Sequence, residues 1–239
     1  VSYSDNVDAG TAKVTVTGRG NFAGEISKTF NIQPADITNY NVTLDQGSAV
    51  YTGSAIEPKV TVTREAAGTE GTEVIELVKD TDYTVSYSDN VDAGTATVTV
   101  TGAGNYTGTA TQYFDIVAKS LEGGTATLSA NAYAYNGAFR KPAVTVTVDG
   151  VALAKDTDYI VAYKNNKSVG KATVTITGTG NYEGALTRTF KINPKGTTIK
   201  APARLTKGFQ AKWAKQSAKM ATTRVTGYQV RYPAKKSMT

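Results

Sequence analysis

The chain contains no cysteine and no histidine among its 239 residues. Without cysteine it has neither disulfide bonds nor thiolate ligands for a metal, so its stability must come from apolar packing and hydrogen bonds within sheets. Without histidine it lacks Ser-His-Asp and Cys-His catalysis, imidazole-ligated zinc and the usual general base near neutral pH. An enzyme built from this sequence would have to use carboxylate, lysine, tyrosine or hydroxyl groups.

Long hydrophobic runs are absent as well. No stretch of about 18 apolar residues occurs, so the sequence predicts no transmembrane helix, and the first residues lack the pattern of a signal peptide. Because the chain begins with Val1 inside a repeated unit, we expect it to be an internal fragment of a longer protein.

Repetition is the main feature that the sequence does contain. Residues 1–18 return as residues 85–102 with a single difference, at Lys13, and a third copy follows in which Val161 corresponds to Val85. Tandem copies of a small unit provide reach and repeated surface, because each copy must only fold and hold a shape. This pattern favours a stalk or a binding role over catalysis.

The copies and a change in charge divide the chain into four parts. They are the C-terminal part of a truncated repeat (1–34), two complete repeats (35–117 and 118–194) and a basic module (195–239). The joints are short and two contain proline, which predicts a semi-rigid array. The first complete repeat has eight extra residues within 64–73, which predict a lengthened exposed hairpin.

The spacing of apolar residues predicts an all-β fold. In residues 95–101, Ala96, Val98 and Val100 alternate with four threonines, the period-2 pattern of a half-buried strand. About seven short strands occur in one complete repeat, and no segment has a helical period long enough to cover a sheet. A second layer must then be another sheet, which predicts tandem β-sandwiches. The alternative is a small β-grasp-like sheet with one helical segment. The predicted strands are 37–44, 50–52, 59–64, 74–78, 83–87, 95–101 and 109–116.

Several motifs recur at fixed places in these copies. They are Tyr-(Thr/Asn)-Gly from Tyr51, Asp-Thr-Asp-Tyr from Asp80, Gly-Asn-Tyr-x-Gly from Gly104 and Thr-Phe-x-Ile from Thr189. Over residues 1–194 this combination resembles the immunoglobulin-like repeats, including the MBG type, of bacterial cell-surface and adhesin proteins. The resemblance implies tandem immunoglobulin-like sandwiches in an elongated array, held outside the cell at the surface or wall.

The basic module resembles the start of a fibronectin type III module. It has Leu205, alternating Phe209, Ala211 and Trp213, and a Tyr-x-Val-x-Tyr strand ending at Tyr232. Residues 193–239 contain eleven Lys or Arg and no Asp or Glu, a charge that could bind anionic wall polymers. No motif for nucleic acid is visible. An amphipathic helix over residues 212–220 is an alternative.

Two loops have a functional and a structural interpretation. Asp89 and Asp92 offer oxygen ligands for calcium, but the third copy, 164–168, has lost every carboxylate, which favours a polar hairpin loop. The glycines of 102–106 superficially resemble a phosphate loop, but another strand follows rather than a helix, so a turn is favoured.

Aromatic and acidic residues supply the remaining candidates. Tyr106, Tyr182 and Phe22 follow the recurring glycine turn, where packing at the sandwich edge is the simplest interpretation and contact with a glycan or a protein is the alternative. The densest carboxylates favour a solvated hairpin over an acid/base pair, because strand alternation separates the first two. These are Glu73, Glu76, Asp80 and Asp82. An internal Lys-Asn isopeptide bond is disfavoured because no suitable trio recurs between copies.

These observations predict a non-enzymatic stalk or adhesin segment without catalytic, cofactor or metal residues. The expected partners of this monomeric array are proteins or glycans of a host or a neighbouring cell, and no nucleic acid. A second hypothesis is an accessory spacer or glycan-binding array of an extracellular enzyme whose catalytic domain lies outside this sequence.

Overall fold

The computed structural model describes residues 1–68, 71–196, 199–205 and 208–213, and in these ranges the chain is all-β. The one helical element there is a single 3-10 turn, Ile37–Asn39. No helix in the described part is long and apolar enough to cross a membrane. The chain divides into two compact units, Val1–Lys119 and Ser120–Thr239.

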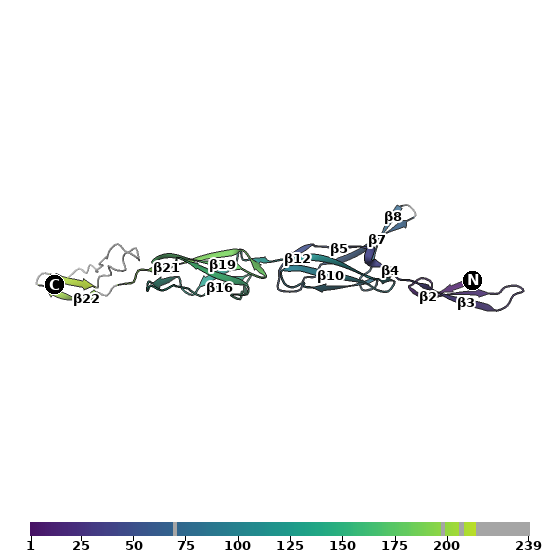
Figure 1. The fold of residues 1–239 in the computed structure, drawn as a ribbon, viewed down its shortest axis with the longest axis horizontal. Coiled ribbons are helices and arrows are strands. Elements are labelled where there is room, and N and C mark those ends of the chain that lie inside the picture. Colours follow the sequence, from purple (N-terminus) through teal and green to yellow (C-terminus); the bar gives the residue numbers. More distant parts are fainter. Residues whose placement is uncertain (69–70, 197–198, 206–207, 214–239) are drawn as a thin grey trace, which may run out of the picture. The chain divides into compact units, whose positions relative to one another are not determined.

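The first unit begins with an antiparallel sheet of three strands (Figure 1). They are β1 (Ser2–Ser4), β2 (Gly10–Thr17) and β3 (Glu25–Ile32), in the order β1-β2-β3.

Two further sheets of the first unit enclose one hydrophobic core. One sheet has the order β6-β12-β10-β9, with β6 parallel to β12, and the other has the order β5-β7-β8. Residues from both sheets, such as Val62 and Val98, are fully buried in this core. The strands are β5 (Asn41–Leu44), β6 (Ser48–Val50), β7 (Val60–Gly68), β8 (Gly71–Glu76), β9 (Tyr83–Ser88), β10 (Gly94–Gly102) and β12 (Thr109–Val117), with a short parallel pair of β4 (Ala35–Asp36) and β11 (Tyr106–Thr107).

The second unit repeats this plan with its own core. Its sheets have the orders β15-β21-β19-β18 and β14-β16-β17. The strands are β13 (Lys119–Ser120), β14 (Thr125–Leu128), β15 (Ala132–Ala134), β16 (Val144–Val148), β17 (Val151–Ala152), β18 (Tyr159–Lys164), β19 (Gly170–Gly178), β20 (Tyr182–Glu183) and β21 (Ala185–Asn193).

A final antiparallel hairpin joins β22 (Ile199–Leu205) to β23 (Gly208–Trp213). The four residues from Leu205 to Trp213 that suggested a fibronectin module lie on it. Lys212 lies in β23, so a helix over residues 212–220 does not start there, and the rest of that segment falls outside the described residues. The predicted strand that ends at Tyr232 lies outside them as well.

Three predicted strands are partly wrong. The predicted strands 50–52 and 74–78 run past the observed ones, because β6 is Ser48–Val50 and β8 ends at Glu76. Residues 37–44 were expected to be extended throughout, but Ile37–Asn39 forms the 3-10 turn and the strand starts only at Asn41. The Asp36 carboxylate accepts hydrogen bonds from the Thr38 amide and hydroxyl, and this local cap competes with the sheet. These two bonds also lower the pKa of Asp36.

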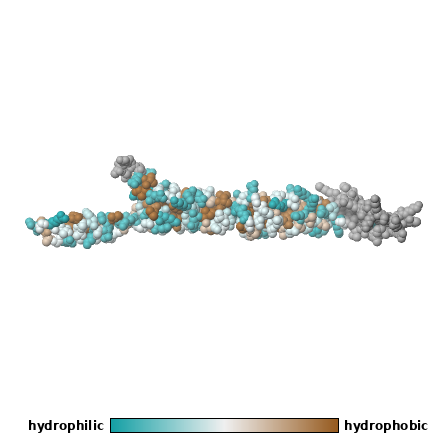
Figure 2. Space-filling view, turned by 180° about the vertical axis from the view of Figure 1, so that it is seen from behind, coloured by the Kyte–Doolittle hydropathy of each residue, from teal (hydrophilic) through white to brown (hydrophobic). Residues whose placement is uncertain are grey.

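The predicted lengthened hairpin is confirmed. β7 and β8 pair from Thr63 and Glu76 out to Gly68 and Gly71, and Figure 1 shows this end standing away from the two sheets below it. Hydrophobic surface lies on the hairpin and where it meets the body of the molecule (Figure 2). Val74, which pairs with Glu65 within the hairpin, is exposed.

A close backbone crossing explains the glycine at the end of β10. A Cβ on Gly102 would lie 2.6 Å from the amide nitrogen of Thr107, and the Gly102 N–H donates to the Gly108 carbonyl at 2.9 Å. The equivalent Gly178 has the same tight approach, 2.7 Å from the Glu183 nitrogen. The chain crosses itself here, so no larger residue fits.

Candidate functional site

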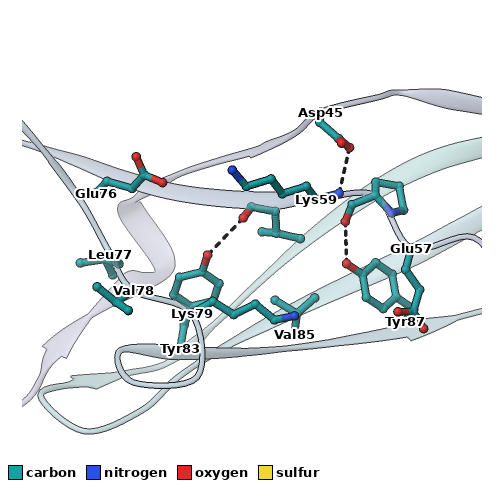
Figure 3. A pocket seen from close by; sticks show the side chains of 12 residues that line it. Asp45, Glu57, Lys59, Glu76, Leu77, Val78, Lys79, Tyr83, Val85 and Tyr87 are labelled. Atoms are coloured by element: carbon teal, nitrogen blue, oxygen red, sulfur yellow. Dashed lines mark hydrogen bonds between the residues drawn. The ribbon is translucent and has the colours of Figure 1, made fainter.

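A cleft of about 650 Å³ opens on the side of the first complete repeat, residues 35–117, which is the second repeat of the chain. The cleft lies between the edge strand β9 and the β7–β8 hairpin (Figure 3). Its apolar floor comes from both sheets and includes Val60, Leu77 and Val85. Its rim carries five charged side chains: Asp45, Glu57, Lys59, Glu76 and Lys79.

Two tyrosines of β9 cross the floor and tie the sheets together. The Tyr83 hydroxyl donates to the Val60 carbonyl at 3.1 Å, and the Tyr87 hydroxyl donates to the Pro58 carbonyl at 2.6 Å (Figure 3). Burial raises the pKa of both phenols. The carboxylates of Glu76 and Asp80 raise the pKa of Tyr83 further. Both hydroxyls are therefore protonated donors at neutral pH.

The rim charges are not paired with one another. In the part of the chain that the structure describes, no rim lysine has its nitrogen within 4.0 Å of a rim carboxylate. The Asp45 carboxylate instead accepts the backbone N–H of Lys59 at 2.8 Å, and the Lys59 side chain extends from there along the rim toward Glu76 (Figure 3). Burial raises the pKa of Tyr87 most, and the carboxylates of Glu57 and Asp45 raise it further.

The third repeat, residues 118–194, has the same two tyrosine hydrogen bonds at the equivalent place. The Tyr159 hydroxyl donates to the Val144 carbonyl at 2.9 Å and the Tyr163 hydroxyl to the Pro142 carbonyl at 2.6 Å. The hydroxyl of Ser129, at the place of Asp45, accepts the backbone N–H of Ala143, at the place of Lys59, at 2.9 Å.

The third repeat changes the rim. The five equivalent positions carry two lysines and no carboxylate: Ser129, Lys141, Ala143, Ala152 and Lys155. Burial again raises the pKa of Tyr163, but here Lys155 acts to lower it. The same pair of phenols thus lies beneath a predominantly acidic rim in one repeat and a basic rim in the other.

The aromatic residues singled out from the sequence lie away from the cleft. Tyr106 packs half-buried against the core, with its ring centroid 6.1 Å from that of Tyr40 at 77°. Tyr182 packs in the same way against the core of the third repeat. Phe22, in the β2–β3 connection, is 79% exposed. A glycan or protein contact at these three residues stays a prediction.

The loop at Asp89 is hydrogen-bonded to the segment before β7. The Asn90 side chain donates to the Ile56 carbonyl at 3.0 Å and the Ile56 N–H donates back to the Asn90 carbonyl at 2.9 Å. Asn166 makes the same pair of bonds with Arg140 without any carboxylate in its loop. Among the described residues no group of three or more acidic side chains could hold a metal. These bonds favour the structural interpretation of the loop.

The glycine turn and the acidic cluster also have structural explanations. The Tyr106 N–H donates to the Ala103 carbonyl at 3.0 Å, which closes the predicted turn, and the short strand β11 follows it. Asp82 accepts the Val78 N–H at 2.8 Å and Asp80 has a left-handed φ of 65°, so both carboxylates belong to a tight turn. Glu76 alone of this cluster lines the cleft.

The sequence interpretation missed most of the cleft, although a signal was present. Aligning the two complete repeats shows charge changes at positions 45, 57, 59 and 76, whereas Pro58 and Tyr83 beside them are kept. No protein-family model, curated protein or solved structure matches this chain. The case for its function therefore rests on its own residues.

Proposed function

We propose that this chain is a non-enzymatic segment of a secreted bacterial surface protein, a stalk or adhesin whose tandem immunoglobulin-like repeats form an elongated array and present binding surface. A fibronectin-like module follows the repeats. The observation that supports the proposal is the contrast between the two complete repeats, which keep one scaffold and change one rim.

The shared features are those that hold a repeat together. Both repeats bury the same alternating positions, such as Val98 and Val174, and both use two tyrosines and one asparagine to join their sheets. The changed features are exposed and charged, and exposed charges add little to stability. These positions can therefore change to suit a partner, because they lie outside the buried core.

The acidic rim over the apolar floor of the second repeat is the surface we assign to recognition. Its partner is a protein or glycan of a host or a neighbouring cell that offers cationic or hydroxyl groups. Hydrogen bonds to charged groups contribute about 1.5–3 kcal/mol each, so two or three such bonds at the rim would dominate the affinity.

The test replaces the rim of the second repeat with that of the third. The variant is Asp45→Ser, Glu57→Lys, Lys59→Ala and Glu76→Ala in the full chain. Every new residue already occupies the equivalent place in the third repeat, so the fold should survive. Binding to arrays of glycans and host surface proteins should fall about tenfold or more, since one lost charged bond suffices for that factor.

The matched control makes the reverse exchange in the third repeat: Ser129→Asp, Lys141→Glu, Ala143→Lys and Ala152→Glu. This variant should gain binding to the same partners. Unchanged binding by both variants would contradict the assignment of the cleft. Small-angle scattering from residues 35–194 tests the array itself, because two repeats end to end give a larger maximum dimension than two repeats side by side.

A further inference from the structure

The side chain of Asn105 joins the second repeat to the repeat before it. Its Oδ1 accepts the backbone N–H of Ala9 at 2.7 Å, and its Nδ2 donates to the Asp8 carboxylate at 2.8 Å. Both partners belong to the turn that precedes β2 in the N-terminal sheet. One amide therefore uses its donor and its acceptor on two neighbouring residues that lie 96 and 97 positions away in the sequence.

The local structure holds Asn105 in place for this contact. Gly104 has a left-handed φ of 60°, and the Asn105 carbonyl accepts the Ala35 N–H at 2.9 Å. Tyr106 anchors the other side by packing on Tyr40. The three residues of the Gly-Asn-Tyr motif thus have separate roles, because the glycine makes the turn, the asparagine makes the contact and the tyrosine fixes the loop to the core.

An asparagine suits this contact better than the related side chains. Asn offers one acceptor and two donors on a short planar group, whereas Asp has no donor for a carboxylate and would repel Asp8. The bond to Asp8 is assisted by charge, which strengthens it relative to a neutral pair.

Both halves of the contact recur in the sequence. Asp8 and Ala9 correspond to Asp92 and Ala93, and Asn105 corresponds to Asn181. Where the third repeat has Ser-Val in place of Asp-Ala, at 168–169, the module after it contains no Gly-Asn-Tyr motif. Along the chain, an Asp-Ala turn is followed in the next repeat by a Gly-Asn-Tyr motif, and where the turn is lost the motif is lost as well.

We propose that the side-chain amide of Asn105 is a head-to-tail docking residue, and that the partner it fits is the Asp-Ala-Gly turn at the far end of a preceding repeat of the same kind. This inference goes beyond the proposed function, since it concerns the joint between repeats and holds whether or not the cleft binds a partner. The amide defines the orientation of the joint, which the two-residue linker Gln33 and Pro34 alone would leave broader.

The absence of native cysteine allows a direct test on the full chain. Spin labels at Lys28→Cys and Thr111→Cys, both exposed strand positions, report the distance across the joint by double electron–electron resonance. In the Asn105→Ala variant we expect the distance distribution to widen about twofold, because the joint then loses both hydrogen bonds and depends more on its short linker. Asp8→Ala should widen it as well. The double variant should have a distribution no wider than the broader of the two single variants, because both residues act through one contact.

Two controls separate docking from general damage. Asn105→Asp keeps the size of the side chain but loses its donor, and should widen the distribution as Asn105→Ala does. Asn41→Ala, an exposed asparagine on β5, should leave it unchanged. The thermal unfolding midpoint of the second repeat should stay the same in all five variants. A parental distribution in both Asn105→Ala and Asp8→Ala, or equal widening in Asn41→Ala, would overturn the proposal.

Discussion

The N-terminal sheet and the β9-β10-β12 part of the second repeat share sequence and strand pairing, but only the latter is covered by another sheet. Ser2 pairs with Thr15 as Ser86 pairs with Thr99. The burial differs sharply. Phe30 is 43% exposed in the N-terminal sheet, whereas the equivalent Phe114 is 2% exposed.

This difference separates what a local sequence determines from what a partner sheet adds. Alternating residues and glycine turns are enough to give the strands and their register in both places. Among the described residues of the first unit, the buried core cluster and the bonds between sheets lie where β5 and β7 face the second sheet. Tyr3 is 60% exposed, while the equivalent Tyr87 donates across to Pro58. Most of the stability of a repeat should therefore come from contacts between its sheets.

Removing the buried ring should give the largest contrast. Phe114→Ala creates a cavity in the core and should lower the free energy of unfolding of the second repeat by about 3–5 kcal/mol. Phe30→Ala, the matched change in the uncovered sheet, should leave the stability of the second repeat unchanged. Amide hydrogen exchange at Val98 measures this stability. An equal loss in both variants would show that the N-terminal sheet and the second repeat unfold as one cooperative unit.

Alkaline pH should weaken the covered repeats through their phenols. Burial raises the pKa of Tyr83, Tyr87, Tyr159 and Tyr163 in the folded chain. As the pH rises past about 10, the phenols of the unfolded chain ionise first, so the unfolded state gains stability. The free energy of unfolding should thus be constant below that pH and fall from there up through the raised pKa values.

Denaturant unfolding at a series of pH values, with tyrosinate absorbance as the second signal, tests this prediction. The four phenols of Tyr83, Tyr87, Tyr159 and Tyr163 should ionise together with unfolding. Ionisation of all tyrosines well before the sheets lose their circular dichroism signal would contradict the role assigned to the four buried hydroxyls.

The sequence predicted the strands well because their causes are local. The alternation of Val98 and Val100 with threonines gave a strand, and the Gly- and charge-rich insertion gave the lengthened hairpin. The 3-10 turn at Ile37 was missed because a single side chain, Asp36, decides it. The pairing of β6 with β12 was out of reach because it joins segments far apart in the chain.

The candidate site was less accessible to the same reasoning. The predicted contact residues follow the glycine turns, where aromatic side chains draw attention, yet Tyr106 and Tyr182 pack on the cores. The cleft brings Lys59 and Glu76 from one sheet to Tyr87 on the other, and no local pattern encodes that meeting. Only the comparison of the two complete repeats, position by position, carries the signal.

Removing one hydroxyl should give the smallest and most specific contrast. Tyr87→Phe leaves the partly buried Pro58 carbonyl without its donor, which should cost the second repeat about 0.5–1.5 kcal/mol. Tyr3→Phe removes the hydroxyl at the equivalent place in the uncovered sheet, where in the described residues it donates to nothing, and should cost no measurable stability. The denaturant midpoints of the two variants measure both losses of stability, provided that the free energy of unfolding depends on denaturant concentration with the same slope in each. A loss in Tyr3→Phe as large as that in Tyr87→Phe would mean that the phenol contributes within its own sheet, so that the second sheet adds packing but no specific bond.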